Sequence, residues 1–149
     1  MDEWDIRCLN DAIAEARAGL AEGGIPIGAV LATADGVLGA GHNRRIQLGS
    51  PIRHGETDAL EVAGRQPASV YRSATMYTTL SPCDMCTGAI LLYGIPRVVI
   101  GENQTFMGSE ALLRERGVEV IVADNAECIA MMEAFIAENP TLWNEDIGE

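Results

Sequence analysis

The sequence predicts a three-layer α/β/α sandwich built on a mixed sheet of five strands. An Asp-Gly turn between two apolar segments, at residues 33–36, predicts an antiparallel hairpin. From residue 97 onward, strand, helix and strand patterns alternate with short connections, which favours parallel pairing of the last two strands through a right-handed crossover. A length of 149 residues with 48% hydrophobic residues is typical of one domain, 1–149, with a continuous core.

The first half of the chain predicts two helices and the hairpin. Residues 2–22 show apolar side chains at helical spacing up to a Glu-Gly-Gly stop. The side chains expected to face the core are Ile6, Leu9, Ile13, Ala16 and Leu20. Strands are predicted over 25–32 and 36–43 on either side of the turn. A helix over 55–65 has an acidic first turn, which suits the positive end of the helix dipole.

The second half alternates strands and helices. Residues 73–80 are rich in β-branched and aromatic side chains and predict a strand. The helix that follows Pro82 is apolar nearly all round, so we expect it to be buried. The remaining predicted elements are a strand at 97–101, a helix at 109–117, a strand at 118–123 and a helix at 126–139 that Pro140 stops.

The segment at residues 140–149 is too polar for a core and contains Trp143. A frayed end is one interpretation, because the last residues of a chain are often poorly ordered. A Trp at this place is better explained if the segment folds back over another part of the protein.

Charge and hydropathy argue against two kinds of partner. Ten Lys and Arg against 22 Asp and Glu give a formal charge of −12, which disfavours a nucleic acid. The only basic cluster is Arg44, Arg45 and Arg53. No apolar segment is long enough to span a membrane and no signal peptide is recognised, so we expect a cytoplasmic protein without a membrane partner. Four cysteines in a reducing compartment favour metal binding or catalysis over disulfides.

Two cysteines, Cys83 and Cys86, stand where a helix is predicted to begin. Ser81 is a suitable N-cap, Pro82 suits the first helical position, and Asp84 completes a capping-box pattern. Side chains three residues apart share a helix face, so both sulfurs can reach one metal ion. The helix N-terminus also favours the thiolate form, which binds metal.

The other candidate ligands are few. Cys8 and Cys128 lie among apolar residues, where a lone Cys usually behaves as a small hydrophobic side chain, and His42 is interpreted as an ordinary hydrogen-bonding residue. His54 then completes a set of three. Catalytic zinc sites have three protein ligands and leave one position open, and Glu56 supplies an acid/base group beside them. Because residues two apart point in opposite directions on a helix, His54 must lie at the helix start.

The H-x-E motif at 54–56 together with P-C-x-x-C at 82–86 is the signature of zinc nucleobase deaminases. The chain resembles the cytidine deaminase superfamily, and within it the small fungal-type cytosine deaminases that act on the free base. Nearly the whole chain shares the resemblance, through "EGGIPIGAVL", "GHN", "HGE", "YTTLSPCDMCTGAI", "YGIPR", "GEN" and "EDIGE". It implies a cytidine deaminase-like fold, a homodimer and one Zn²⁺ per subunit.

The resemblance also implies roles for individual residues. It implies His54, Cys83 and Cys86 as zinc ligands and Glu56 as the proton shuttle. The residues implied to contact a small nucleobase are Asn43, Gly55, Ser81, Asp146, Phe106, Trp143 and Ile27. The segment 140–149 is implied to be a lid over the active site. Asp58 and Arg53 depart from the fungal pattern, which has a small hydroxyl residue and an apolar residue there.

The expected reaction is the hydrolytic deamination of cytosine to uracil and ammonia, with 5-substituted cytosines as further substrates. Deamination of guanine, isocytosine, creatinine or another small cyclic amidine stays open. A tRNA adenosine deaminase is disfavoured by the charge of −12. A non-catalytic, zinc-stabilised binding domain is the remaining alternative, but such a site has no use for Glu56.

Overall fold

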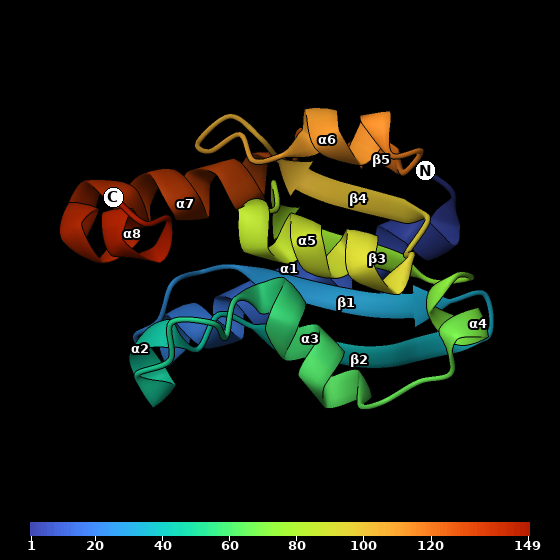
Figure 1. The fold of residues 1–149 in the computed structure, drawn as a ribbon. Helices are drawn as coiled ribbons and strands as arrows, with labels where there is room; N and C mark the ends of the chain where they lie inside the picture. Colours follow the sequence, from blue (N-terminus) through green and yellow to red (C-terminus); the bar gives the residue numbers. More distant parts are fainter.

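A computed structural model describes residues 1–149 and shows one five-stranded sheet with helices around it (Figure 1). The strands are β1 (Gly28–Thr33), β2 (Gly36–His42), β3 (Thr75–Leu80), β4 (Arg97–Glu102) and β5 (Glu119–Val122). The helices are α1 (Glu3–Ala21), α2 (Arg45–Leu48), α3 (Gly55–Ala63), α4 (Ala68–Tyr71), α5 (Asp84–Tyr93), α6 (Glu110–Glu115), α7 (Ala126–Glu138) and α8 (Pro140–Asp146). The short helices α2 and α4 were not predicted, because a single turn has too few residues to show periodicity.

The sheet has the strand order β2-β1-β3-β4-β5 and is mixed. Strand β1 pairs antiparallel with β2 and with β3. Strands β3 and β4 pair in parallel, as do β4 and β5, so a helix connects each parallel pair. The predicted hairpin and the predicted parallel pairing of the last two strands are both confirmed.

The helices form the two outer layers. Helices α1 and α7 cover one face of the sheet, where one apolar cluster includes Cys8, Val30 and Cys128. Helices α3, α5 and α6 cover the other face, where a second cluster includes Ala59, Ile90 and Leu113. In Figure 1, α3 and α5 lie in front of the sheet and α1 behind it. The predicted α/β/α sandwich is therefore confirmed. No helix is both long and apolar enough to cross a bilayer.

The predicted core face of α1 is partly wrong. The middle three of its five residues are buried, whereas Ile6 and Leu20 are 49% and 43% exposed. The helix instead lies against β1 through its small residues. A Cβ atom added at Gly28 would lie 2.1 Å from the carbonyl oxygen of Ala12, so only glycine permits this approach. Close backbone packing, rather than side-chain size, decides which face is buried.

Helix α5 is not buried all round, contrary to the prediction. Cys86, Thr87 and Ile90 face the protein, but Leu92 is 76% and Tyr93 43% exposed. The reason is that the helix contacts the rest of the chain along one side, so its apolar outer side is left uncovered.

The C-terminal segment is helical rather than frayed. Helix α8 has Pro140 in its first turn and buries Trp143 and Asp146. Trp143 joins a third apolar cluster that contains Ile25 and Ile27 before β1, Leu80 at the end of β3, and Met132 and Phe135 of α7. This cluster fixes the segment at one end of the sheet.

A buried ion pair links α1 to the sheet and provides a stability test. The Asp5 carboxylate accepts hydrogen bonds from Arg97 at 2.6 and 2.8 Å and from the Tyr77 hydroxyl at 2.8 Å. The Arg97 guanidinium holds the pKa of Asp5 well below its usual range, despite the burial of the carboxyl.

We expect Asp5→Asn to lower the free energy of unfolding by about 2–3 kcal/mol at pH 7, measured by urea denaturation. Since the pKa of Asp5 is lower in the folded state, its contribution is present above an unfolded-state pKa of about 3.9 and is lost as the pH falls below it. The variant should therefore lose less stability than the wild type in that acid range. Asp11→Asn, at an exposed position of the same helix, is the control. Equal stability of both variants and the wild type would contradict the assignment.

Candidate active site

The sequence-predicted histidine lies at the start of α3. His54 is the N-cap of this helix and has an extended backbone. Its backbone N–H donates to the Thr57 hydroxyl at 2.9 Å, which fixes the first turn. Glu56 lies within that turn. Because His54 precedes the helix, its side chain and that of Glu56 need not point in opposite directions, as side chains two residues apart do in a regular helix. The predicted position of His54 at the helix start is confirmed.

The two cysteines lie at the start of α5, but the predicted cap is wrong. The helix begins at Asp84 and its N-cap is Cys83, two residues later than Ser81. The Ser81 hydroxyl is used elsewhere: it donates to Glu110 at 2.5 Å and accepts from the backbone N–H of Gly108 at 2.9 Å. Its hydroxyl therefore holds the loop before α6 rather than the helix.

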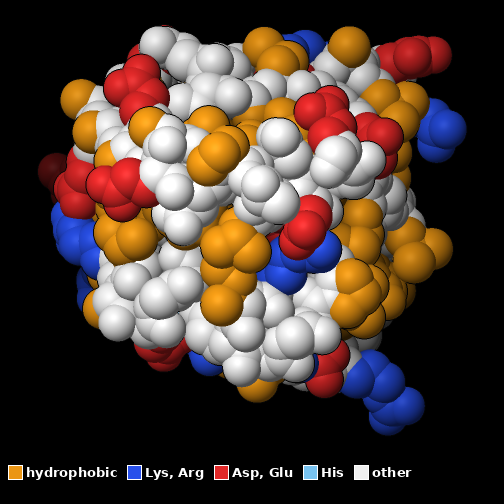
Figure 2. Space-filling model, turned by 90° about the vertical axis from the view of Figure 1, so that its left-hand side faces the viewer, with side chains coloured by type: hydrophobic (Ala, Val, Ile, Leu, Met, Phe, Trp, Pro, Cys, Tyr) orange, Lys and Arg blue, Asp and Glu red, His pale blue; other side chains and the backbone are white.

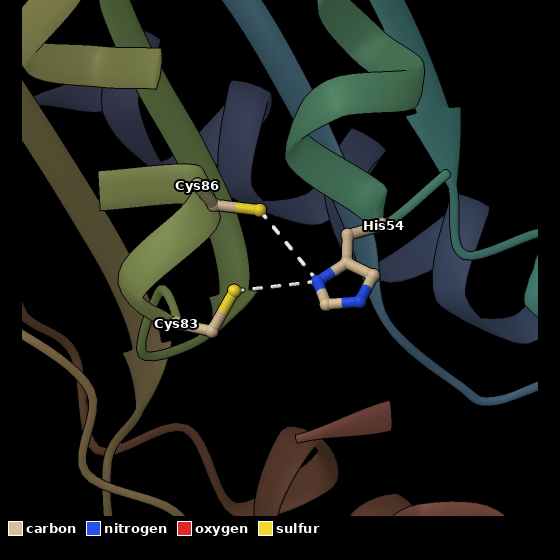
Figure 3. A group of neighbouring side chains, drawn as sticks. All are labelled: His54, Cys83 and Cys86. Carbon is tan, nitrogen blue, oxygen red and sulfur yellow. Dashed lines mark hydrogen bonds between the residues drawn. The ribbon is translucent and has the colours of Figure 1, made fainter. Parts of the chain in front are cut away.

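The three predicted ligands converge (Figure 3). The Nδ1 atom of His54 lies 3.4 Å from Sγ of Cys83 and 3.7 Å from Sγ of Cys86. A tetrahedral zinc ion with Zn–S bonds of about 2.3 Å and a Zn–N bond of about 2.0 Å requires nitrogen and sulfur about 3.5 Å apart. The group therefore fits one zinc ion, and it comprises three ligands, as in a catalytic site.

The surroundings favour a thiolate in this group. A hydrogen bond from Cys86, together with one from His54, lowers the pKa of Cys83 to about 4 against the effect of burial. The hydrogen bond to Cys83 and burial raise the pKa of Cys86 well above its usual value. These contacts thus favour the thiolate form of Cys83, which is the form of cysteine that binds a metal ion.

Glu56 lies beside the ligand group and does not belong to it. Its side chain is buried, and this burial raises its pKa. A carboxyl group whose pKa moves from its usual value towards neutrality is suited to both accepting and donating a proton near pH 7.

Asp146 of α8 connects the C-terminal segment to the ligand group. Its carboxylate lies 3.1 Å from Nε2 of His54, on the ring side opposite the sulfurs. It also accepts from the side-chain amide of Asn43 at 3.2 Å, although 103 residues separate the two in sequence. A carboxylate in this place orients a metal-binding imidazole and keeps its Nδ1 available to the metal.

A small cavity of about 20 Å³ lies next to these groups. Eight of the predicted residues line it: Ile27, His54, Glu56, Ser81, Cys83, Phe106, Trp143 and Asp146. The rings of Phe106 and Trp143 meet edge to face, with centroids 5.7 Å apart. The other three predicted residues do not line the cavity but contact residues that do. Cys86 contacts His54, Asn43 contacts Asp146, and Gly55 lies against the backbone of Ile27.

Sequence reasoning missed two residues that line the cavity, Leu80 and Ile147. Each is the neighbour of a predicted site residue, Ser81 or Asp146, and that adjacency is the signal that could have identified them. Outside the cavity lies a hollow of about 590 Å³ that shares His54, Phe106 and Asp146 with it. The cavity and the hollow are therefore adjacent.

The residues rejected as ligands have other contacts. The ring nitrogens of His42 lie 2.6 Å from Glu15 and 2.6 Å from Glu22. Cys8 and Cys128 are buried in the apolar cluster under α1 and α7. Neither of the two departures from the fungal pattern lines the cavity, and Asp58 pairs with Arg53 at 2.6 Å.

Comparisons with known proteins agree with this geometry. Residues 2–102 match the family model of the cytidine and deoxycytidylate deaminase zinc-binding region. The chain is 57% identical to a cytosine deaminase of Candida albicans, with 97% of each chain covered. It is 32% identical to a tRNA-specific adenosine deaminase of Streptococcus pyogenes, with 87% of this chain and 88% of the relative covered.

Solved structures support the fold. A structure from a study of tRNA:A34 deaminases superimposes with a TM-score of 0.70 at 25% identity, covering 85% of this chain and 99% of that chain. A guanine deaminase of Nitrosomonas europaea superimposes with a TM-score of 0.68 at 20% identity, covering 87% and 83%. The family expected from the sequence motifs is confirmed: the chain belongs to the cytidine and deoxycytidylate deaminase family.

Proposed function

We propose that the protein is a zinc-dependent cytosine deaminase that hydrolyses cytosine to uracil and ammonia. The observation that carries this proposal is the buried Asp146, which reaches the ligand group and Asn43 from a C-terminal segment shared with the fungal-type enzymes. The 57% identity to the Candida albicans cytosine deaminase supports the same substrate. Such an activity would serve the salvage of free pyrimidine bases.

His54, Cys83 and Cys86 would hold the zinc ion. When bound, zinc supplies Lewis acidity, which brings the pKa of a coordinated water towards neutrality. Glu56 would accept a proton from the attacking water and deliver it to ring nitrogen 3 as the new C–O bond forms at carbon 4. It would then take the proton of the new C4 hydroxyl group and deliver it to the amino group, so that the C4=O bond forms, the C–N bond breaks and ammonia leaves. General acid/base action of this kind is worth about 10²–10⁴ in rate.

The ring would be held by polar groups around it. The side chains of Asn43 and Asp146, the backbone N–H of Gly55 and the backbone carbonyl of Ser81 offer donors and acceptors for its edge. Ile27, Phe106 and Trp143 would cover its faces. Buried polar groups that need partners reject a ring that leaves them unpaired far more strongly than they reject a missing methyl group.

We propose that residues 140–149 act as a lid within a single domain, 1–149. The cavity of about 20 Å³ has room for little more than one water molecule. A pyrimidine ring therefore enters only if the wall that includes Phe106, Asp146 and Ile147 moves. This wall separates the cavity from the outer hollow.

A tRNA substrate is disfavoured by the surface. The formal charge is −12, and all ten basic residues are arginines. On the face that carries α2 and α8, Arg side chains are scattered among acidic and hydrophobic ones, with no continuous basic strip (Figure 2). Phosphate neutralisation would require such a strip. Guanine and other cyclic amidines are the alternatives that the activity test must separate, because the Nitrosomonas europaea relative shares the fold.

The activity test is ammonia release from cytosine, 5-methylcytosine, isocytosine, guanine, adenine and creatinine, by protein of measured zinc content. We expect cytosine to have the highest kcat/KM and the zinc content to be one ion per chain. A kcat/KM for guanine well above that for cytosine would overturn the proposed substrate.

We propose that the protein is a cytoplasmic homodimer. All four cysteines are free thiols, as a reducing compartment keeps them. A hollow of about 730 Å³ lies away from the ligand group between α3, α4 and α5. Leu92 and Tyr93 on its edge are exposed apolar side chains, which are typical of a protein–protein interface.

We expect Leu92→Glu to convert the dimer to monomers, because it places a charge in the apolar interface. Light scattering coupled to gel filtration measures the mass. Leu20→Glu, on α1 in the opposite layer, is the control and should leave the dimer intact. A dimer that survives Leu92→Glu would exclude this face as the interface.

A further inference from the structure

Asp58 is a fully buried carboxylate in α3 that the proposed mechanism does not use. Its Oδ2 atom accepts from the backbone N–H of His42 and from Nε of Arg44, both at 3.0 Å. Its Oδ1 atom accepts from Nε and Nη2 of Arg53, at 2.9 and 2.6 Å. Four donors thus converge on one side chain, and both oxygens are used.

The donors flank two residues of the active site. His42 and Arg44 are the neighbours of Asn43, the residue that contacts Asp146. Arg53 directly precedes His54, the histidine of the ligand group. One carboxylate therefore holds the chain on both sides of Asn43 and immediately before His54.

The backbone is arranged to permit these contacts. A Cβ atom at Gly41 would lie 2.5 Å from Oδ2 of Asp58, so the end of β2 approaches α3 closely only because this residue is glycine. The backbone N–H of Arg44 also donates to the carbonyl of Arg53 at 2.9 Å, which joins the two flanking segments directly. The Asp58 carboxylate therefore links the segment around Asn43 to the segment that precedes His54.

We propose that Asp58, with Arg44 and Arg53, is a positioning residue that fixes Asn43 and His54 relative to each other. The inference rests on the proposed function, since it treats Asn43 as a substrate contact. Asp58 does not touch the cavity, so it acts through the two segments that it holds. An Asn at this position has one oxygen for four donors, and its amide group would face a donor. The flanking segments would then shift, although the fold would remain.

The first experiment compares Asp58→Asn with Asp5→Asn. Both wild-type residues are buried aspartates bound by arginine, but Asp5 lies on α1 and holds no active-site segment. We expect both variants to have a lower Tm. Only Asp58→Asn should raise the KM for cytosine, by about tenfold or more, because small displacements of positioning groups are costly. It should also speed the loss of zinc to a chelator by about tenfold, since outer contacts of a metal ligand set its affinity.

The second experiment tests the contact of Asp58 with Arg44 and its contact with Arg53 separately. Both arginine side chains are partly exposed. Arg44→Gln should raise the KM for cytosine and leave the rate of zinc loss unchanged. Arg53→Gln should speed zinc loss instead. These variants keep the test decisive if Asp58→Asn does not fold.

The outcomes separate the two proposals. A KM and a zinc-loss rate in Asp58→Asn equal to those of Asp5→Asn would reduce Asp58 to a stability role and overturn the inference, as would wild-type values in both arginine variants. A wild-type protein that releases no ammonia from cytosine would overturn the proposed function instead. The zinc-loss comparison of Arg53→Gln would still decide whether Asp58 positions His54.

Discussion

Glu56→Gln is expected to lower kcat for cytosine by about 10²–10⁴-fold while one zinc ion stays bound per chain. Gln has nearly the same shape as Glu but cannot carry a proton between water and the ring. The ligand group of His54, Cys83 and Cys86 remains intact, so metal content should not change. Steady-state ammonia release and zinc analysis of the same sample measure both quantities.

The matched control for this variant is Glu61→Gln, an exposed carboxylate on the same helix. It should retain wild-type kcat and wild-type zinc content. Near-normal turnover by Glu56→Gln would remove Glu56 from its assigned role. Loss of zinc from Glu56→Gln would show that the carboxylate supports the metal rather than the proton transfers.

Asp146→Asn should lower kcat/KM for cytosine by about 10²-fold or more, because one carboxylate serves two purposes. It contacts Nε2 of His54 at 3.1 Å, which orients the metal ligand, and it contacts Asn43 at 3.2 Å, within the expected base-binding site. An amide at this position is a weaker acceptor for the His54 ring. We therefore expect both a higher KM and weaker zinc retention, measured by competition with a chelator.

Glu149→Gln serves as the control, since it changes an exposed carboxylate of the same C-terminal segment. It should have wild-type kinetics and zinc retention. If Asp146→Asn altered only the Tm and left kcat/KM unchanged, the C-terminal carboxylate would play no part in catalysis and the lid proposal would lose its main support.

The positions of the ligands at helix starts were predictable because their determinants are local, whereas the pairing of His54 with cysteines about 30 residues away was predicted from the combined motif. The spacing of Cys83 and Cys86 at a helix start brings two sulfurs to one side whatever the rest of the fold does. The position of His54 before α3 follows from the two-residue spacing to Glu56. The hairpin and the alternation of strands and helices are likewise encoded in short segments, so the layers and the sheet could be predicted with small errors at the ends of elements.

Errors arose where a choice depended on distant parts of the chain. Ser81 has the chemistry of an N-cap, but Glu110, 29 residues away, takes its hydroxyl. The apolar residues of α5 suggested burial, yet Leu92 is exposed because nothing in the chain covers that side. Asp58 and Arg53 appeared as two separate departures from the fungal pattern, whereas the fold makes them one ion pair.

The sequence by itself determined the family to which the chain belongs, and it predicted which side chains would bind zinc and which carboxylate would move protons. The tertiary structure alone decided how those groups are enclosed. It brought Asp146 to His54 and Asn43, closed a small cavity with Phe106 and Trp143, and placed Asp58 between two active-site segments. The physical reason is that helix starts and turns depend on neighbours within a few residues, whereas burial and long-range hydrogen bonds depend on which surfaces meet after the whole chain has folded.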